Sequence, residues 1–351
     1  MPHSGYMDKE IIRRILNEYE LEAHELLPAQ KGYRNESRPI VLHSGQTVNL
    51  MLYKSEPGML DRIRRANSVS DFLSLQGFPT RRTLSKNIIR LKSGTLTRYG
   101  AIYNYLPGQT IPWEAYSKLY IKLLGATMSN MHATLKAYKA TLPSVADEYL
   151  QITERMGRYF RDPHVQQAMQ RKLALNVNRA TIGEFNTLLA ACKKLPNQQA
   201  LHMDFVRGNI LFDTAGVSGI LDFEKVSHGH PLFDIARTLA FLLVDCKYTP
   251  DAKVRKYFLY SGYNKRGTSA FRNILLTAGT TKINLLEQLL DLFLFYDFYK
   301  FLRHNPYEFL EQNNHFVRTR DLLVERQVIA YNNRKGATNG RRLEEKADFA
   351  E

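Results

Sequence analysis

Apolar residues recur along the first third of the chain with spacings that predict a small sheet accompanied by helices. Between residues 38 and 54, Val48, Leu50 and Leu52 occupy every second position, as in a strand with one buried face. The turn-forming residues His43–Gly45 divide this stretch into two strands. The pattern also predicts a helix over 8–26, a helix over about 60–75 and a second strand pair at about 87–105.

Helical spacing dominates the rest of the chain. Helices are expected at about 113–138, 146–173, 177–194, 231–246, 251–262, 283–304 and 315–330. One hairpin interrupts them at 208–223, where two apolar segments flank Asp-Thr-Ala-Gly and Gly216 allows a positive φ. This order predicts an α+β protein with a small β-rich N-terminal lobe over 1–106 and a larger, mainly helical C-terminal lobe over 107–330. The polar residues 331–351 are expected to form a disordered tail.

Composition indicates the net charge of the protein and its expected cellular location. The 351 residues are 44% hydrophobic, which suffices for sizeable cores. Every apolar run is shorter than the ~20 residues of a membrane span, so we expect no membrane contact. Two cysteines in apolar surroundings favour a cytoplasmic location. The net charge of +15 includes an excess between Lys31 and Arg98, where 13 Lys or Arg face 4 Asp or Glu and attract anions such as nucleotides.

The hairpin contains the residues with the most informative chemistry. Asn209 and Asp222 lie equally far from a turn centred on Ala215–Gly216, so cross-strand pairing should bring them to roughly 5 Å from each other. An amide oxygen beside a carboxylate forms a hard-oxygen site that suits Mg²⁺. Asp204, five residues before Asn209, can act as the base or orienting group for a hydroxyl nucleophile.

These residues match a known pattern. His202-Met203-Asp204, then Asn209, then Asp222-Phe223-Glu224 resembles the H-G-D-x-x-x-x-N and D-x-E or D-x-D core of the aminoglycoside phosphotransferase/choline kinase-like family. The continuation GHPLFDIARTLA is similar to that family's G-x-P-x-x-D-(L/I)-A, and the resemblance covers roughly residues 25–305. It implies a bilobal protein-kinase-like fold and an ATP-dependent transfer of the γ-phosphoryl group to a small-molecule hydroxyl.

The resemblance also implies roles for single residues. Asp204 would accept or orient the proton of the substrate hydroxyl, and His202 would orient the loop by hydrogen bonding. Asn209 and Asp222 would hold the Mg²⁺ that bridges the ATP phosphates. Asp234, at the start of a helix, would brace the catalytic loop.

Nucleotide contacts are implied upstream of this core. Lys54, at the end of a strand, would neutralise the α- and β-phosphates of ATP. The interlobe hinge would receive the adenine edge with its backbone groups, and its residues would be Tyr103, Asn104, Tyr105 and Leu106.

Three positions depart from the family's pattern. Met203 replaces the usual Gly beside the catalytic Asp. The helix Glu that pairs with the strand Lys is missing, because its position falls near Ala66 or Asn67, and Asp71 is the surrogate one turn farther along. The phosphate loop is glycine-poor, with Gly32 as its candidate glycine.

Two other classes of function are open at this point. The missing helix Glu favours a catalytically weak or inactive nucleotide-binding regulatory protein. The sequence SHGHP allows a zinc-dependent hydrolase, although the kinase interpretation already explains the spacing of Asp and Asn. The zinc ligands would then be His228, His230, His202 and Asp204.

The acceptor hydroxyl is not identified by the sequence. An aminoglycoside is a polycation, and a site for it needs clustered carboxylates. The candidates in the C-terminal helices are Asp291, Asp297, Glu308 and Glu311. A net charge of +15 opposes steering of such a ligand, so choline, sugars, amino-alcohols and protein-linked hydroxyls stay open. We expect a nucleotide and a small-molecule hydroxyl as partners, and no nucleic acid.

Overall fold

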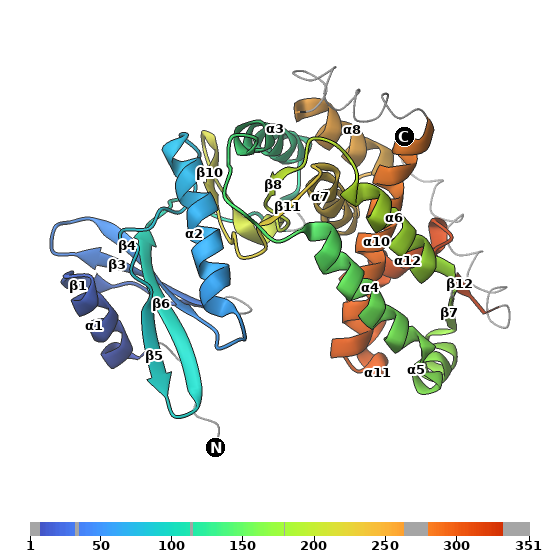
Figure 1. Cartoon of the computed structure of the whole chain (residues 1–351), viewed down its shortest axis with the longest axis horizontal. Coiled ribbons are helices and arrows are strands. Elements are labelled where there is room, and N and C mark those ends of the chain that lie inside the picture. The colour runs from blue at the N-terminus through green and yellow to red at the C-terminus, as the bar shows by residue number, and fades with distance from the viewer. Residues whose placement is uncertain (1–7, 32–34, 113–114, 179, 263–279, 333–351) are drawn as a thin grey trace, which may run out of the picture. The chain divides into compact units, whose positions relative to one another are not determined.

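The protein forms two compact units that are interleaved along the chain. The computed structural model describes residues 8–31, 35–112, 115–178, 180–262 and 280–332 (Figure 1). The first unit takes its described residues from Met1–Ala115, Ala126–Leu142 and His202–Val226, and the second from Tyr116–Gly125, Pro143–Leu201 and Ser227–Glu351. The lobe boundary expected at residue 106 stays a prediction. The expected tail lies outside the described residues from position 333 onward.

An antiparallel sheet organises the first unit. Its order is β1-β3-β4-β6-β5, with β2 also paired to β3. The strands are β1 (Ala23–Leu26), β2 (Gln30–Lys31), β3 (Glu36–Leu42), β4 (Thr47–Tyr53), β5 (Ile89–Ser93) and β6 (Leu96–Asn104). The helices beside it are α1 (Lys9–Glu18) and α2 (Met59–Leu75). The two predicted strand pairs and the second helix are therefore confirmed.

Alternation along β4 explains why helices cover both faces of this sheet. Val48, Leu50 and Leu52 are fully buried and pack in one cluster with the apolar side of α1. Tyr53 points the other way and packs with Met59 and other residues of α2. Successive side chains of a strand alternate between the faces, so a single strand serves two cores.

The predicted hairpin is also present in the first unit. Its strands are β9 (Ile210–Asp213) and β10 (Gly216–Ile220), which follow the 3₁₀ turn η3 (Arg207–Asn209). Gly216 has a φ of 134°, as its position in the turn predicted. The hairpin is joined to the segment after α2, because the Ile220 N–H donates to the Pro79 carbonyl at 2.7 Å.

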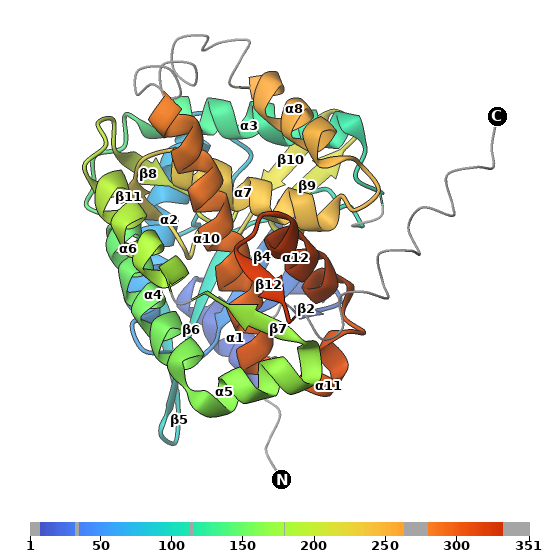
Figure 2. The same ribbon diagram turned by 90° about the vertical axis from the view of Figure 1, so that its right-hand side faces the viewer.

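Helices of different lengths make up most of the second unit (Figure 2). They are α4 (Val145–Arg161), α5 (Pro163–Ala168), α6 (Ala180–Lys193), α7 (Leu232–Asp245), α8 (Asp251–Gly262), α10 (Thr280–His304), α11 (Tyr307–Leu310) and α12 (Asn314–Glu325), with a short π-helix η2 at Met169–Leu173. Helix α3 (Lys118–Leu135) spans the chain boundary between the units. Helix α10 packs against α6, α7 and α12, and its Phe293, Phe295 and Phe298 are fully buried.

Short strand pairs account for the main differences from the sequence prediction. The first helix ends at Glu18 rather than at residue 26, since Glu20 adopts a φ of 54° and β1 then pairs with β3. The last helix ends at Glu325, and β12 (Ile329–Tyr331) pairs with β7 (Leu175–Val177) instead. A further unpredicted pair joins β8 (Gln199–Leu201) to β11 (Ser227–Gly229).

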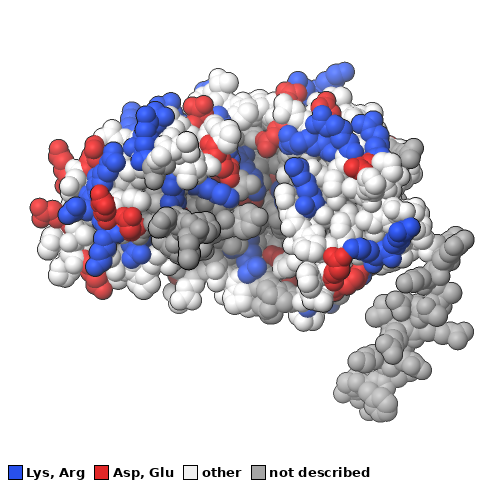
Figure 3. Space-filling view, turned by 90° about the horizontal axis from the view of Figure 1, so that it is seen from below, with Lys and Arg blue, Asp and Glu red and all other residues white. Residues whose placement is uncertain are grey.

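Charge on the surface is mixed. On the face shown in Figure 3, Lys and Arg side chains lie in several groups separated by acidic or uncharged side chains. Within the described ranges, no helix is both long and apolar enough to cross a membrane.

Candidate functional site

The loop before the hairpin holds Asp204 in a fixed conformation. Its side chain is mostly buried, and its backbone carbonyl accepts two hydrogen bonds of 2.9 Å, from the Val206 N–H and from Nδ2 of Asn209. The Asn209 carbonyl in turn accepts a hydrogen bond from the Leu221 N–H at 2.7 Å. The structure therefore ties Asp204, Asn209 and the end of β10 together within the first unit.

His202 holds this loop through two hydrogen bonds of its imidazole ring. Its Nδ1 accepts the Asp204 N–H at 3.2 Å, which assigns the proton of the neutral ring to Nε2. Nε2 then donates to the Leu221 carbonyl at 3.1 Å. The imidazole is fully buried and packs edge-on against Phe223 and Phe205. This geometry suits the orienting role expected for His202 rather than proton transfer.

Lys225 contacts Asp204 directly. Its Nζ lies 2.8 Å from Oδ1 of Asp204, and the lysine side chain is 45% exposed whereas the carboxylate is 11% exposed. Sequence reasoning did not select Lys225. The visible signal was its position immediately after Asp222-Phe223-Glu224, but its partner is not apparent from that position.

Residues at the end of the hairpin carry oxygen atoms suited to a metal ion. Asn209 uses Nδ2 for Asp204, so its Oδ1 is the atom that remains for a cation. Asp222 accepts the Glu224 N–H at 3.3 Å, and Glu224 is buried beside it. Burial and the neighbouring Asp222 both raise the pKa of Glu224. A divalent cation would relieve this repulsion, and an amide oxygen with two carboxylates is a donor set that Mg²⁺ accepts.

The cross-strand register differs from the expected one by a single residue. A bulge between Val217 and Gly219 shifts the pairing, so that Ile220 faces Ile210 and the Leu221 N–H reaches the Asn209 carbonyl. Asp222 follows immediately rather than lying directly opposite Asn209. The equal-distance argument was therefore wrong by one position, because the turn pairs Asp213 with Gly216 and is centred between Thr214 and Ala215, and the extra residue of the bulge offsets only part of that difference.

Asn35 links the strand region to the metal end of the site. Its Oδ1 accepts the backbone N–H of Lys54 at 3.2 Å, and its Nδ2 donates to Glu224. The Lys54 side chain is exposed and makes no ion pair with any residue that the structure describes. Its phosphate role stays a prediction, as does that of Gly32, which lies outside the described residues.

The four hinge residues differ in exposure. Tyr103 is fully buried, and the Asn104 N–H donates to the Arg82 carbonyl at 3.0 Å. Tyr105 is 39% exposed and Leu106 is half-buried. Tyr105 and Leu106 directly follow the last residue of β6, and their contact with a purine edge stays a prediction.

Asp71 does not serve as the partner of Lys54. Its two carboxylate oxygens accept the N–H of Thr83 at 2.8 Å and the hydroxyl of Thr83 at 2.6 Å. At the position of the expected helix Glu, Oδ1 of Asn67 accepts the Tyr103 hydroxyl at 2.9 Å. The surrogate pairing is therefore wrong, because Asp71 fastens the segment after α2 instead.

Comparisons with known proteins identify the family of the chain. The family model described as the phosphotransferase enzyme family matches residues 25–258, about two thirds of the chain. The chain belongs to this phosphotransferase family. No curated protein matches the chain at the required significance.

Solved structures of phosphotransferases share the fold at low sequence identity. The amicoumacin kinase hAmiN is 14% identical with a TM-score of 0.64, over 92% of this chain and 94% of that one. A microcompartment-associated aminopropanol kinase is 11% identical with a TM-score of 0.60, over 92% and 98%. The wild-type aminoglycoside 2'-phosphotransferase-IIIa is 12% identical with a TM-score of 0.52, over 91% and 98%. The α+β, protein-kinase-like fold is thereby confirmed.

Membership of the phosphotransferase family makes the backbone at position 203 informative. Met203, which stands where the family usually has Gly, has a φ of 62°, and Asp222 has a φ of 56°. Left-handed backbone is the region that glycine adopts freely, and non-glycine residues held there cost of order 1–3 kcal/mol each. The Met203 side chain is 97% buried, so its packing offsets part of this cost.

Asp234 belongs to the second unit, whereas the hairpin belongs to the first. It occupies the first turn of α7 in the second unit and is fully buried. The start of this helix is capped by His230, whose Nδ1 accepts the Leu232 N–H at 3.2 Å. Bracing of the phosphotransferase loop by Asp234 stays a prediction.

The zinc alternative has no support in the structure. Among the residues with described coordinates, no three His, Cys, Asp or Glu side chains converge to hold a metal ion. His228 is exposed on β11, whereas His230 is buried and caps α7. This finding does not bear on a magnesium site of Asn209, Asp222 and Glu224, because that site has only two carboxylates and its third ligand is an amide.

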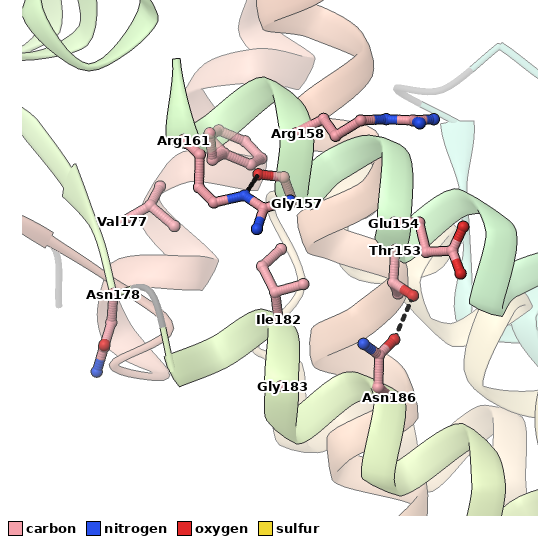
Figure 4. A pocket seen from close by; sticks show the side chains of 11 residues that line it. Thr153, Glu154, Gly157, Arg158, Arg161, Val177, Asn178, Ile182, Gly183 and Asn186 are labelled. Atoms are coloured by element: carbon pink, nitrogen blue, oxygen red, sulfur yellow. Dashed lines mark hydrogen bonds between the residues drawn. The ribbon is translucent and has the colours of Figure 1, made fainter. Parts of the chain in front are cut away.

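A cavity of about 480 Å³ opens within the second unit (Figure 4). Its walls come from α4, α6 and the end of β7, and none of the predicted phosphotransferase residues lines it. Two polar groups in the wall form local hydrogen bonds. The Thr153 hydroxyl donates to Oδ1 of Asn186, and Nε of Arg161 donates to the Gly157 carbonyl at 3.0 Å.

Proposed function

We propose that the protein is an ATP-dependent phosphotransferase that transfers the γ-phosphoryl group to a hydroxyl of a small molecule. The observation that supports this most is the hydrogen-bonded arrangement of Asp204, Asn209 and the end of β10 inside the first unit. The loop carries the buried Asp204, Asn209 is bonded to it, and the chain belongs to a phosphotransferase family. These are the groups that phosphoryl transfer to an alcohol uses.

In this proposal Asp204 handles the acceptor. Its carboxylate accepts the hydroxyl proton as the acceptor oxygen bonds to the γ-phosphorus and the bond from that phosphorus to the β,γ-bridging oxygen breaks. His202 and Asn209 keep the loop in place through the backbone of Asp204. Transfer of this kind depends mainly on positioning and on electrostatic stabilisation, so the rigidity of the loop contributes directly to the rate.

The nucleotide and its metal ion would use the residues around the hairpin end. Asn209, Asp222 and Glu224 would hold Mg²⁺, which supplies positive charge to the phosphates when bound. Lys54 would add a charge from its exposed position, and Tyr105 and Leu106 would receive the adenine edge. The structure of amicoumacin kinase hAmiN contains AMP-PNP and Ca²⁺, which supports the use of a nucleotide with a divalent cation.

The four carboxylates considered for a polycationic acceptor are already neutralised. Each contacts a basic side chain of the second unit. The pairs are Asp291 with Arg326, Asp297 with Arg237 and Lys300, Glu308 with Lys172, and Glu311 with Arg320. Asp297 is the most firmly held, since Arg237 and Lys300 outweigh its burial and lower its pKa. We therefore propose an acceptor with little or no positive charge, in preference to an aminoglycoside.

A nucleotide-binding regulatory protein is the second candidate function. It is favoured by the replacement of the helix Glu with Asn67, which bonds to Tyr103, and by the exposed Lys54. Such a protein would bind nucleotide without turnover, so the rate of phosphoryl transfer to an acceptor distinguishes the two candidates.

A panel of acceptors assayed for phosphorylation with ATP and Mg²⁺ tests the function. The panel should contain sugars, amino-alcohols, choline and aminoglycosides, with GTP and Ca²⁺ or Zn²⁺ as alternative cofactors. We expect Mg²⁺-dependent transfer to a hydroxyl compound of low charge. Nucleotide binding with no phosphoryl transfer to any acceptor would favour the regulatory protein, and aminoglycosides as the best acceptors would refute the proposed acceptor class.

We expect Lys225→Met to lower kcat by about 10- to 100-fold. Lys225 holds Oδ1 of Asp204 at 2.8 Å and adds positive charge where negative charge moves during transfer. The loss should be smaller than the ~10²–10³ of a buried donor, because water screens a half-exposed lysine. Steady-state kinetics measure it, with Lys86→Met as the control for loss of an exposed lysine in the same unit. An unchanged kcat would reduce the contact to a surface ion pair.

A further inference from the structure

Arg81 is a buried cation that sequence reasoning did not select. It follows Thr80, which pairs in parallel with Ile220 at the end of β10, beside Asp222. The segment is anchored on both sides, since the Thr80 hydroxyl donates to the Ser70 carbonyl at 2.8 Å and Pro79 accepts the Ile220 N–H. The anchoring places the Arg81 side chain beside the proposed metal end of the hairpin.

The guanidinium of Arg81 has few partners. The residue is 95% buried, and its centre lies 4.5 Å from the ring centroid of Tyr103 and 6.0 Å from that of Tyr53. The hydroxyls of these rings bond to each other at 2.7 Å, and Tyr103 bonds to Asn67. Nε and Nη2 of Arg81 are buried without a hydrogen-bond partner. Buried charged donors in this state are costly, so a ligand that satisfies them would bind favourably.

The nearest carboxylates do not supply that partner. Asp222 and Glu224 act on Arg81 electrostatically, but neither forms an ion pair with it in the part of the chain that the structure describes. Asp222 accepts the Glu224 N–H, and Glu224 accepts Asn35. An anion at this end of the hairpin would complete the charge balance, and arginine presents a planar set of donors that matches phosphate oxygens.

We propose that Arg81 binds the phosphate groups of the nucleotide, which rests on the proposed phosphotransferase function. The side chain reaches the site from the segment after α2, whereas the family's lysine comes from a strand. In this chain Asn67 replaces the helix Glu, and Lys54 is exposed. Arg81 thus supplies a buried positive charge that Lys54 alone does not. The aromatic rings of Tyr53 and Tyr103 hold the guanidinium in place before any ligand binds.

A phosphate-length series tests this proposal without depending on turnover. The affinities of adenosine, AMP, ADP and AMP-PNP, the last two with Mg²⁺, are measured by isothermal titration for the wild-type protein and Arg81→Met. We expect the affinity for ADP and AMP-PNP to fall about 10- to 100-fold, as loss of charged hydrogen bonds implies, with adenosine unchanged. Arg82→Gln is the control, because the side chain of Arg82 is exposed and adjacent in sequence.

The outcomes separate the possible roles of Arg81. Equal loss across the whole series, or no loss for any ligand, would overturn the proposal, since a structural role affects adenosine as well. Should Arg81→Met fail to fold, Arg81→Lys keeps the charge but removes the planar donors, and a loss confined to the phosphorylated ligands is again the supporting result. A wild-type protein that binds no member of the series would refute the proposed function itself, and with it this inference.

Discussion

Replacing Asp204 by Asn should lower phosphoryl transfer by about 10²- to 10⁴-fold, which is the range for a positioned acid–base group. Nucleotide affinity should stay unchanged, because Asp204 faces the acceptor hydroxyl in the proposed mechanism rather than the nucleotide. The fold should survive as well, since the backbone carbonyl and N–H of Asp204 hold the loop through hydrogen bonds that the substitution leaves in place. Single-turnover kinetics on the identified acceptor measure the loss.

A matched control for this variant exists on the same hairpin. Asp213→Asn makes the same chemical change at the exposed turn, where Oδ1 of Asp213 accepts the N–H of Ala215 at 2.8 Å and of Gly216 at 3.1 Å. An asparagine can accept these bonds equally well, so activity should be unaffected. If Asp204→Asn retained full turnover, Asp204 would have no part in the chemistry.

Replacing Asp222 by Ala should abolish the metal dependence of nucleotide binding. Even residues that act on a metal through its ligands change affinity by about 10- to 100-fold, so removal of a charged ligand should weaken Mg²⁺-dependent binding of AMP-PNP by on the order of 100-fold or more. Isothermal titration with and without Mg²⁺ gives both affinities. The variant should bind the analogue equally weakly in the two conditions.

The backbone at Asp222 calls for a second variant. Its φ of 56° is strained for alanine, so Asp222→Ala changes the conformation as well as the charge. Asp222→Asn tolerates the left-handed region and removes only the charge, and it should lose most of the metal dependence too. Mg²⁺-dependent affinity equal to that of the wild type in both variants would leave the hairpin with a purely structural role.

Much of the site could be predicted because its residues are close in sequence. The five-residue spacing from Asp204 to Asn209 determines the loop, and the turn residue Gly216 determines the hairpin. The structure contains both the loop and the hairpin. The bulge at Val217 was not predicted, because nothing in two short apolar strands marks which residue is the extra one. Arg81 could not be predicted either, since its neighbours come from β4, β6 and the hairpin, which only tertiary packing brings together.

The fold likewise has elements that could be predicted from the sequence and elements that could not. The strands β3 and β4 were predicted, the second from its clear alternation, as was the helix α2. The strand β1 was predicted as helix, because apolar residues continue past Glu18 with helical spacing, and pairing with β3 outweighs that local preference. The pairs β7–β12 and β8–β11 consist of three-residue strands, which are too short to establish a period.

The interleaving of the two units bears on how the chain is synthesised and folded. Residues of the first unit return at 126–142 and again at 202–226, so the ribosome must deliver residues 116–125 and 143–201 of the second unit before the first is complete. The pairing of Pro79 with Ile220 closes only then, and contacts this distant in sequence form slowly. Until it forms, the sheet lacks the hairpin that packs beside the segment after α2, and a nascent chain of this length exposes apolar surface. A fragment that stops before residue 202 would therefore be a poor reporter of the sheet's stability and a candidate substrate for chaperones.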